Sequence, residues 1–244
     1  MRIRRSVVRT GKRKMHIKYV FSFENGIDEV FDLKFDNAWE HIIEEDASAL
    51  PAWTELEYNK CPNCPISSAD RPRCPAAVSL VDFAKRLGKI VSFEKVQLAV
   101  LTDERWVGQN TTAQRAMGSL MGLLLATSGC PITAYMRPMA RFHLPLSNDL
   151  ETAYRAVGMY LVGQYLRYKT IQDSDFNLKG LINIYDELHE INIAIAQRLK
   201  DSGVVTEVNA LVMLDLFAQG IPNSIEDRLP EFDYLFSAYT TQDR

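Results

Sequence analysis

Four cysteines are the residues of this sequence with the clearest chemical potential. They read Cys61-Pro-Asn-Cys64-Pro, Cys74-Pro and Cys130-Pro, so each precedes a proline although the chain has only ten prolines. The C-x₂-C spacing of the first pair lets two thiolates bind one ion from a single turn. The prolines bias each cysteine toward extended conformations, which sets the direction of its thiol. We therefore expect Cys61, Cys64, Cys74 and Cys130 to converge on one metal site.

The identity of the metal stays open at this point. Four thiolates in a tetrahedral array suit Zn²⁺ or an iron–sulfur cluster. Pro65 stands where the commonest zinc turn has glycine, and the spacing matches neither ferredoxin pattern. The cofactor is then Zn²⁺ or an iron–sulfur cluster, and the remaining alternative is four reduced thiols without a metal. Pro131 suits a first helical position, so we expect Cys130 to be an N-cap residue whose thiolate the helix favours.

A second candidate site follows the last cysteine. The segment RPMARFHLP places Arg137, Arg141 and His143 in a short apolar stretch. Two guanidinium groups can grip a carboxylate or phosphate, and an imidazole can transfer protons, so the trio could form an anion site. The alternative is that the arginines pair with the protein's own carboxylates and the histidine caps a helix.

These residues must be positioned by two β-hairpins and a series of helices. Residues 16–24 and 27–35 alternate between apolar and polar side chains around Asn25-Gly26, the sequence of a type I′ turn. Residues 91–102 alternate again and turn at Asp103-Glu104 into residues 105–109. The two hairpins could form one antiparallel sheet. A short helix is expected to begin at Asn37.

Helical periodicity covers the rest of the chain. One helix is expected over residues 76–87, and the others over 111–129, 131–138, 150–169, 178–200, 206–219 and 225–238. Strands precede helices, which is the order of an α+β fold. We predict N-terminal antiparallel β-hairpins with a Cys-rich loop, followed by a C-terminal helical bundle of about five helices. Residues 15–110 and 111–240 are expected to form one compact unit.

The charge of the chain is uneven. Residues 1–14 carry seven basic side chains and no acidic one, which leaves 21 basic against 31 acidic side chains, a net charge of −10, in the remainder. Three explanations of the basic tail stay open. It could be a disordered, solvated segment, it could be absent from the protein because translation really starts at Met15, or it could bind an anionic partner. The acidic body argues against nucleic acid as a partner.

The amino-acid composition limits which class of protein this chain can belong to. Apolar residues make up 47% of the chain and charged residues 24%, the balance of an ordinary globular protein. No run approaches the roughly 18 apolar residues that span a bilayer, and the first 14 residues lack the apolar core of a signal peptide. We therefore expect a cytoplasmic protein without a membrane segment, in which disulfides are disfavoured.

Several motifs carry a resemblance to a known family. The strings CPNCP, CPAAVSLVD, SLMGLLLATSGCP, RPMARFHLP and MYLVGQYLR resemble an uncharacterised bacterial family that is classified only as a domain of unknown function. The resemblance extends over about residues 16–235. It implies a bacterial cytoplasmic protein and brings no activity, cofactor or catalytic residue.

Three functions remain open from the sequence. The first is a non-enzymatic binding or regulatory module in which the four cysteines form a closed structural metal centre. The apolar segment 206–219 would then be buried or would contact a second copy or another protein. The second is an iron–sulfur redox or sensor protein. The third is an enzyme that acts on a small anionic metabolite through Arg137, Arg141 and His143.

Overall fold

A four-stranded antiparallel sheet forms one layer of the computed structural model, which describes residues 15–43, 49–170, 172–201, 203 and 229–240. The strands are β1 (Met15–Phe23), β2 (Asp28–Phe35), β3 (Lys95–Thr102) and β4 (Trp106–Thr112), in the order β2-β1-β3-β4. All neighbours are antiparallel, so the two predicted hairpins join into one sheet through β1 and β3. The basic tail and the expected helix over residues 206–219 lie outside the described residues.

The first hairpin closes differently from the predicted type I′ turn. Residues 24–26 form the loop, because the Phe23 N–H donates to the Ile27 carbonyl at 3.0 Å. Gly26 has a φ of +80° whereas Asn25 does not enter the left-handed region, and the Asn25 side chain accepts from the Ile27 N–H at 3.0 Å. A three-residue loop with a left-handed glycine gives the same strand pairing as the shorter turn.

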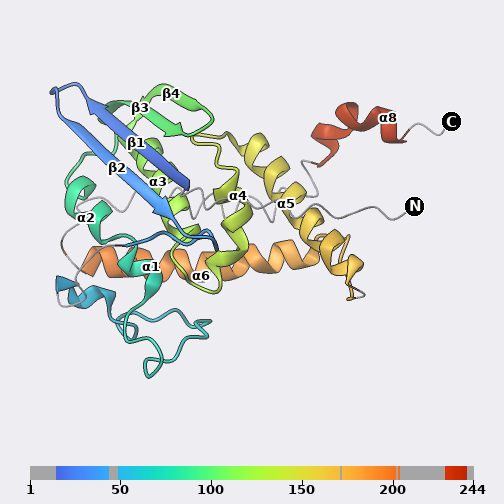
Figure 1. Ribbon diagram of the computed structural model, residues 1–244, viewed down its shortest axis with the longest axis horizontal. Helices are drawn as coiled ribbons and strands as arrows, with labels where there is room; N and C mark the ends of the chain where they lie inside the picture. The colour runs from blue at the N-terminus through green and yellow to red at the C-terminus, as the bar shows by residue number, and fades with distance from the viewer. Residues whose placement is uncertain (1–14, 44–48, 171, 202, 204–228, 241–244) are drawn as a thin grey trace, which may run out of the picture.

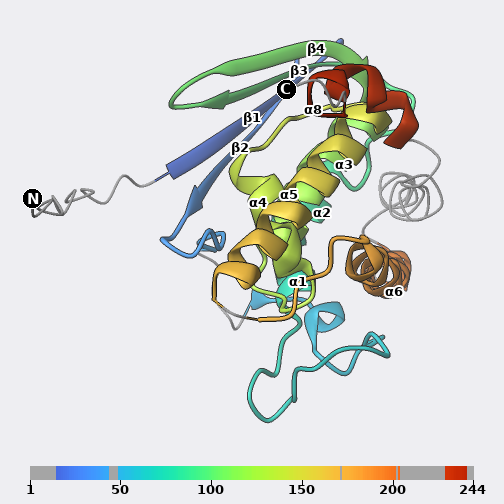
Figure 2. The same cartoon turned by 90° about the vertical axis from the view of Figure 1, so that its right-hand side faces the viewer.

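One face of the sheet is buried under helices. The alternating apolar residues of the strands are buried, including Ile17, Tyr19 and Phe21 of β1 and Val96, Leu98 and Val100 of β3. Side chains of a strand alternate between faces, so this pattern puts the core on a single side. Helix α3 (Ala113–Ala126) packs there against β3 and β4, and Figures 1 and 2 show the other long helices beyond it.

The remaining helical segments follow the chain around this core. They are η2 (Ala52–Thr54), α1 (Pro75–Val78), α2 (Val81–Leu87), η3 (Thr133–Met136), α4 (Arg137–Arg141), α5 (Asp149–Lys169), α6 (Lys179–Asp201), η4 (Leu229–Phe236) and α8 (Ser237–Thr240). The predicted α+β class is confirmed. The described helical segments are somewhat more numerous than expected, because the segment after Pro131 forms η3 and α4 rather than one helix.

Three local predictions were wrong, two of them because a nearby polar side chain binds the backbone. The expected helix at Asn37 is a turn, because Asp36 Oδ1 accepts from the Ala38 and Glu40 N–H groups at 2.8 and 2.9 Å. The helix over 76–87 is interrupted between α1 and α2, where the Ser79 hydroxyl donates to the Ala76 carbonyl at 2.8 Å. Cys130 is not an N-cap; that arrangement occurs at Cys74, which precedes Pro75 at the start of α1.

Helices α5 and α6 form a hairpin with a small core of its own. Asn148 caps α5 in a capping box with Glu151, as the sequence predicts. Between the helices, Asp175 Oδ2 accepts from the Tyr160 hydroxyl at 2.9 Å and from the Gly180 N–H at 2.8 Å. This carboxylate therefore joins the middle of α5 to the beginning of α6. Among the described residues, no helix is both long and apolar enough to cross a bilayer.

Candidate functional site

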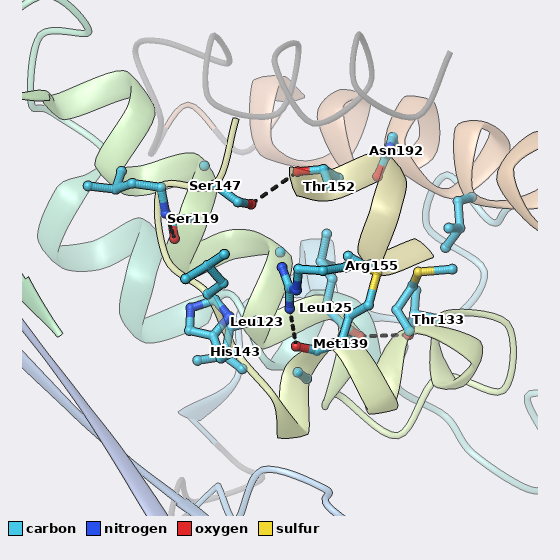
Figure 3. Close-up of a pocket in the computed structure, with 18 of the residues that line it drawn as sticks. Ser119, Leu123, Leu125, Thr133, Met139, His143, Ser147, Thr152, Arg155 and Asn192 are labelled. Carbon is cyan, nitrogen blue, oxygen red and sulfur yellow. Dashed lines mark hydrogen bonds between the residues drawn. The ribbon is translucent and has the colours of Figure 1, made fainter. Parts of the chain in front are cut away.

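A cavity of about 230 Å³ lies within the helical layer. Its walls come from α3, η3, α4, the segment after α4, α5 and α6, and Figure 3 shows side chains from these elements around it. Most of the lining is apolar, with Leu123, Met136, Met139 and Leu188 among the contributors. Segments far apart in the sequence thus enclose a space of the size and character of a small-molecule site.

Helix α3 leaves room for the cavity because it presents small residues. Gly118, Gly122 and Ala126 all line the cavity and follow each other at four-residue steps. Residues four apart lie on the same face of a helix. Glycine in a helix interior lowers helix stability by about 1 kcal/mol relative to alanine. The two glycines on this face therefore destabilise the helix slightly, but they leave the cavity open.

Arg155 places a cation in the wall of this cavity. It lies in the second turn of α5, and its Nη2 donates to the Met139 and Phe142 carbonyls at 2.8 and 2.9 Å. Burial lowers the pKa of its guanidinium, although the group stays protonated at neutral pH. Glu151 is one turn away, but its carboxylate accepts from the Asn148 N–H in the capping box. Within the described chain, Arg155 makes no ion pair.

His143 lines the cavity next to a buried tyrosine of the sheet. Its Nε2 forms a short hydrogen bond with the hydroxyl of Tyr19, which also lies 3.0 Å from the Ser119 Oγ. Burial, together with the nearby charge of Arg155, lowers the pKa of His143 to about 3. Burial also raises the pKa of Tyr19 well above its ordinary range. Both groups are therefore neutral at physiological pH, and they link β1 to the cavity wall.

The cavity is lined by one of the three residues of the predicted anion site. His143 alone lines the cavity. Arg137 forms a short ion pair with Glu40, and Arg141 lies over the Trp39 ring with its guanidinium carbon 5.3 Å from the centroid. The ion pair between Arg137 and Glu40 is the alternative that the sequence left open, in which an arginine pairs with one of the protein's own carboxylates.

Sequence reasoning missed Arg155 and the polar residues that α6 contributes. Tyr185 and Asn192 line the cavity from α6. Asn192 is buried and follows the buried Leu188 at a four-residue step, so it interrupts an apolar helical stripe. A polar side chain in such a stripe is the signal that could have indicated this site.

The four cysteines come together in the main core without forming a ready metal site. All are free thiols; Cys61, Cys74 and Cys130 are buried and Cys64 is partly buried against the same core. Burial, together with the charges that the other three cysteines would carry as thiolates, raises the pKa of Cys61 to about 12. Among the residues that the structure describes, no three His, Cys, Asp or Glu side chains are grouped so as to hold a metal ion.

Comparison with known protein families gives one match, which covers residues 17–237. The chain belongs to DUF6901, a domain of unknown function. The DUF6901 match runs from β1 to the first residue of α8, so it includes both the cavity and the four cysteines. Comparisons with curated proteins and with solved structures give no match. Membership of DUF6901 therefore assigns no activity to either region.

Proposed function

We propose that this chain is a non-enzymatic binding module whose cavity takes a small, largely apolar molecule with one anionic group. The observation that supports it best is Arg155, a cation in the wall of an apolar cavity with no ion-pair partner in the described chain. Arg155 is partly buried, and a charge taken out of water is costly unless a partner compensates it, so a ligand anion would stabilise this site.

The cavity volume limits the size of the ligand. An apolar cavity of about 150 Å³ holds benzene, so 230 Å³ corresponds to a ligand of about nine or ten non-hydrogen atoms. A Kd of about 1 μM would need roughly 0.8 kcal/mol per atom, which is inside the ceiling of about 1.5 kcal/mol for small ligands. Met136 and Met139 in the lining are flexible and would adapt to ligands of different shape.

The free donors of Arg155 specify the charge of the ligand. Only Nη2 donates within the described chain, to the two carbonyls near α4. Among the described residues, the N–H groups on Nε and Nη1 of Arg155 are given no acceptor, and in this proposal they face the ligand. A carboxylate oxygen can accept from one of these two atoms in the plane of the guanidinium. Arg115, on α3, is exposed, so the end of the cavity next to it meets solvent and gives a ligand access.

The state of the titratable groups favours binding over catalysis. A general base works best with a pKa near the operating pH. The pKa of His143 is far below that value, and its Nε2 is engaged by Tyr19. In this proposal the four-cysteine region has a structural role, since no cysteine lines the cavity.

Octanoate, with about ten non-hydrogen atoms, tests the proposal by isothermal titration calorimetry, and 1-octanol serves as its uncharged counterpart. Octanoate should bind the full chain with saturation. Arg155→Gln should weaken octanoate by about 10- to 100-fold, since a hydrogen bond to a charged group contributes about 1.5–3 kcal/mol, and should leave octanol unchanged.

Arg137→Gln and Arg141→Gln are matched controls, because they remove arginines that lie outside the cavity lining. Both should bind octanoate as the unmodified chain does. The proposal fails if octanoate does not saturate, or if the three arginine variants weaken its binding equally.

A further inference from the structure

Helix α5 has a row of large apolar side chains on the side that faces away from the core. Its buried residues lie on one side of the helix and are Ala153, Ala156, Val157 and Tyr160. Five large apolar residues on the other side have exposed fractions of 36–60%, and they are Tyr154, Leu161, Val162, Tyr165 and Leu166. They follow each other at steps that keep them on one face of a helix. We call these residues, with Gly158 between them, the apolar face of α5. Exposed apolar patches of this kind mark interaction sites.

Gly158 lies in the middle of the apolar face of α5. Among the described residues, no atom lies within 4 Å of the position that a Cβ would take there. Glycine in a helix interior lowers helix stability relative to alanine, and no close neighbour in the described chain requires it at this position. A second backbone that approaches the helix here would require it, because glycine permits such close approach.

The charges at the two ends of α5 indicate what covers this face. Asp149 and Glu151 lie in the first turn, and Arg167 and Lys169 lie in the last turn. Arg155 is the only charged residue between them, and it donates to carbonyls near α4. An antiparallel second copy of α5 therefore brings each acidic end next to a basic end, which is the complementarity expected of an interface.

We propose that the apolar face of α5 is the interface of a homodimer in which the α5 helices of two copies pack antiparallel. When Glu151 stands opposite Lys169 of the second copy, Gly158 stands opposite Val162 of that copy. The space above the glycine then receives the branched side chain, as a groove of one helix receives a ridge of the other. A two-fold axis repeats each of these contacts. This inference does not depend on the function proposed for the cavity.

The C-terminal segment of the chain borders only the first half of α5. The rings of Phe232 and Phe236 lie 5.7 and 6.5 Å from the Tyr154 ring, and Figures 1 and 2 show this segment, in red, beside the beginning of α5. Tyr154 nevertheless stays 52% exposed, and Leu166 in the second half of α5 is 60% exposed. In the same register Leu166 of one copy lies opposite Tyr154 of the other, so the two most open parts of the face cover each other.

Sedimentation equilibrium of the full chain tests the dimer. The chain should show a monomer–dimer equilibrium, and Val162→Glu should shift it to the monomer because the interface would bury an unpaired charge. Ile27→Glu is the matched control, since Ile27 is also an exposed apolar residue but lies in the loop between β1 and β2. A chain that stays monomeric at every concentration, or a dimer that persists in Val162→Glu, overturns the proposal.

Gly158→Ala separates the dimer from the stability of the single chain. The new methyl group has open space in the monomer and favours the helix, so the thermal midpoint of the dilute protein should not fall. In the dimer the methyl group would meet Val162 of the second copy, and the dissociation constant should rise about 10- to 100-fold. Gly163→Ala is the matched control, because its Cβ position is equally open but lies about 140° around the helix from Gly158. Equal dissociation constants for the two variants refute the contact at Gly158.

Lys169→Glu tests the antiparallel direction. The new carboxylate would stand opposite Glu151 of the second copy, so the dimer should weaken, and Glu151→Gln in the same chain should restore part of the affinity. Glutamine also fits the capping box at this position. Arg167→Glu makes the same change in net charge in the same turn, but Arg167 is directed toward the Asp173 carbonyl of its own chain. Equal weakening by Lys169→Glu and Arg167→Glu, or no recovery in the double variant, contradicts the proposed register.

Discussion

Replacing Gly180 by alanine should separate the role of close packing at the α5–α6 hairpin from the role of helix propensity. Gly180 is the second residue of α6, and a Cβ placed there would overlap the Tyr160 hydroxyl. That hydroxyl donates to Asp175 Oδ2, which also accepts from the Gly180 N–H. The added methyl group must therefore displace Tyr160 or move the beginning of α6 away from α5.

The expected cost follows from three contributions. Overpacking costs about 1–3 kcal/mol, and loss of the Tyr160 hydrogen bond costs about 1 kcal/mol. Alanine gains at most about 1 kcal/mol of helix propensity, and less in the first turn. Gly180→Ala should thus lower the free energy of unfolding by about 2 kcal/mol.

Tyr160→Phe is the partner variant that makes the reasoning testable. It removes the hydroxyl and should cost about 1 kcal/mol alone, because Asp175 keeps backbone donors from Asn177 and Gly180. In the double variant the nearest ring carbon would stand 3.2 Å from the new Cβ, so the ring has to move by only a few tenths of an ångström. The double variant should therefore cost about 1 kcal/mol, less than the sum of about 3 kcal/mol for the single variants.

Urea unfolding followed by circular dichroism measures all four proteins. The interaction energy between the two positions should be about 2 kcal/mol in the compensating direction. Additive costs would show that Gly180 and Tyr160 do not meet, and the described contact between the helices would then be refuted.

Two further predictions concern the cavity. His143 is neutral in the native state, but below its ordinary pKa of 6.5 it protonates when the chain unfolds. The contribution of His143 to the free energy of unfolding should therefore be full above pH 6.5 and fall by about 2 kcal/mol at pH 5. Urea unfolding between pH 7 and 5 should show a smaller decline for His143→Gln, and an unchanged slope would contradict this reasoning. Gly122→Leu fills space next to Leu123 and should abolish octanoate binding in calorimetry while circular dichroism keeps its helical signal; retained binding would show that the ligand lies elsewhere.

The sheet could be predicted from the sequence because its determinants are local. Alternation in residues 16–35 and 91–109 specifies which side chains face the core, and the observed strands follow it closely. The Asn37 helix failed because the Asp36 carboxylate offered the backbone N–H groups a competing turn. Local periodicity describes the preference of a segment, but one side chain that binds the backbone can override it.

The cavity could not be predicted in the same way, because its parts are distant in the sequence. Arg155 and Asn192 lie on different helices, and each has meaning only when α3 and α4 complete the walls. The two arginines of the predicted anion site, Arg137 and Arg141, are four residues apart in the sequence but contact Glu40 and Trp39 instead of the cavity. The spacing of the cysteines led us to expect one metal site; the structure places three of them in the main core and Cys64 against it, and among the described residues they form no group that could hold an ion.

Helix α6 is shared by the two regions. Asn192 lines the cavity and Arg198 contacts the carbonyls beside the cysteines, six residues or about 9 Å further along the same axis. A ligand that shifts this helix therefore acts on both places at once. Thermodynamic linkage makes such an effect reciprocal: if a rearrangement of the cysteine region changes the affinity of the cavity by some factor, a cavity ligand favours that rearrangement by the same factor.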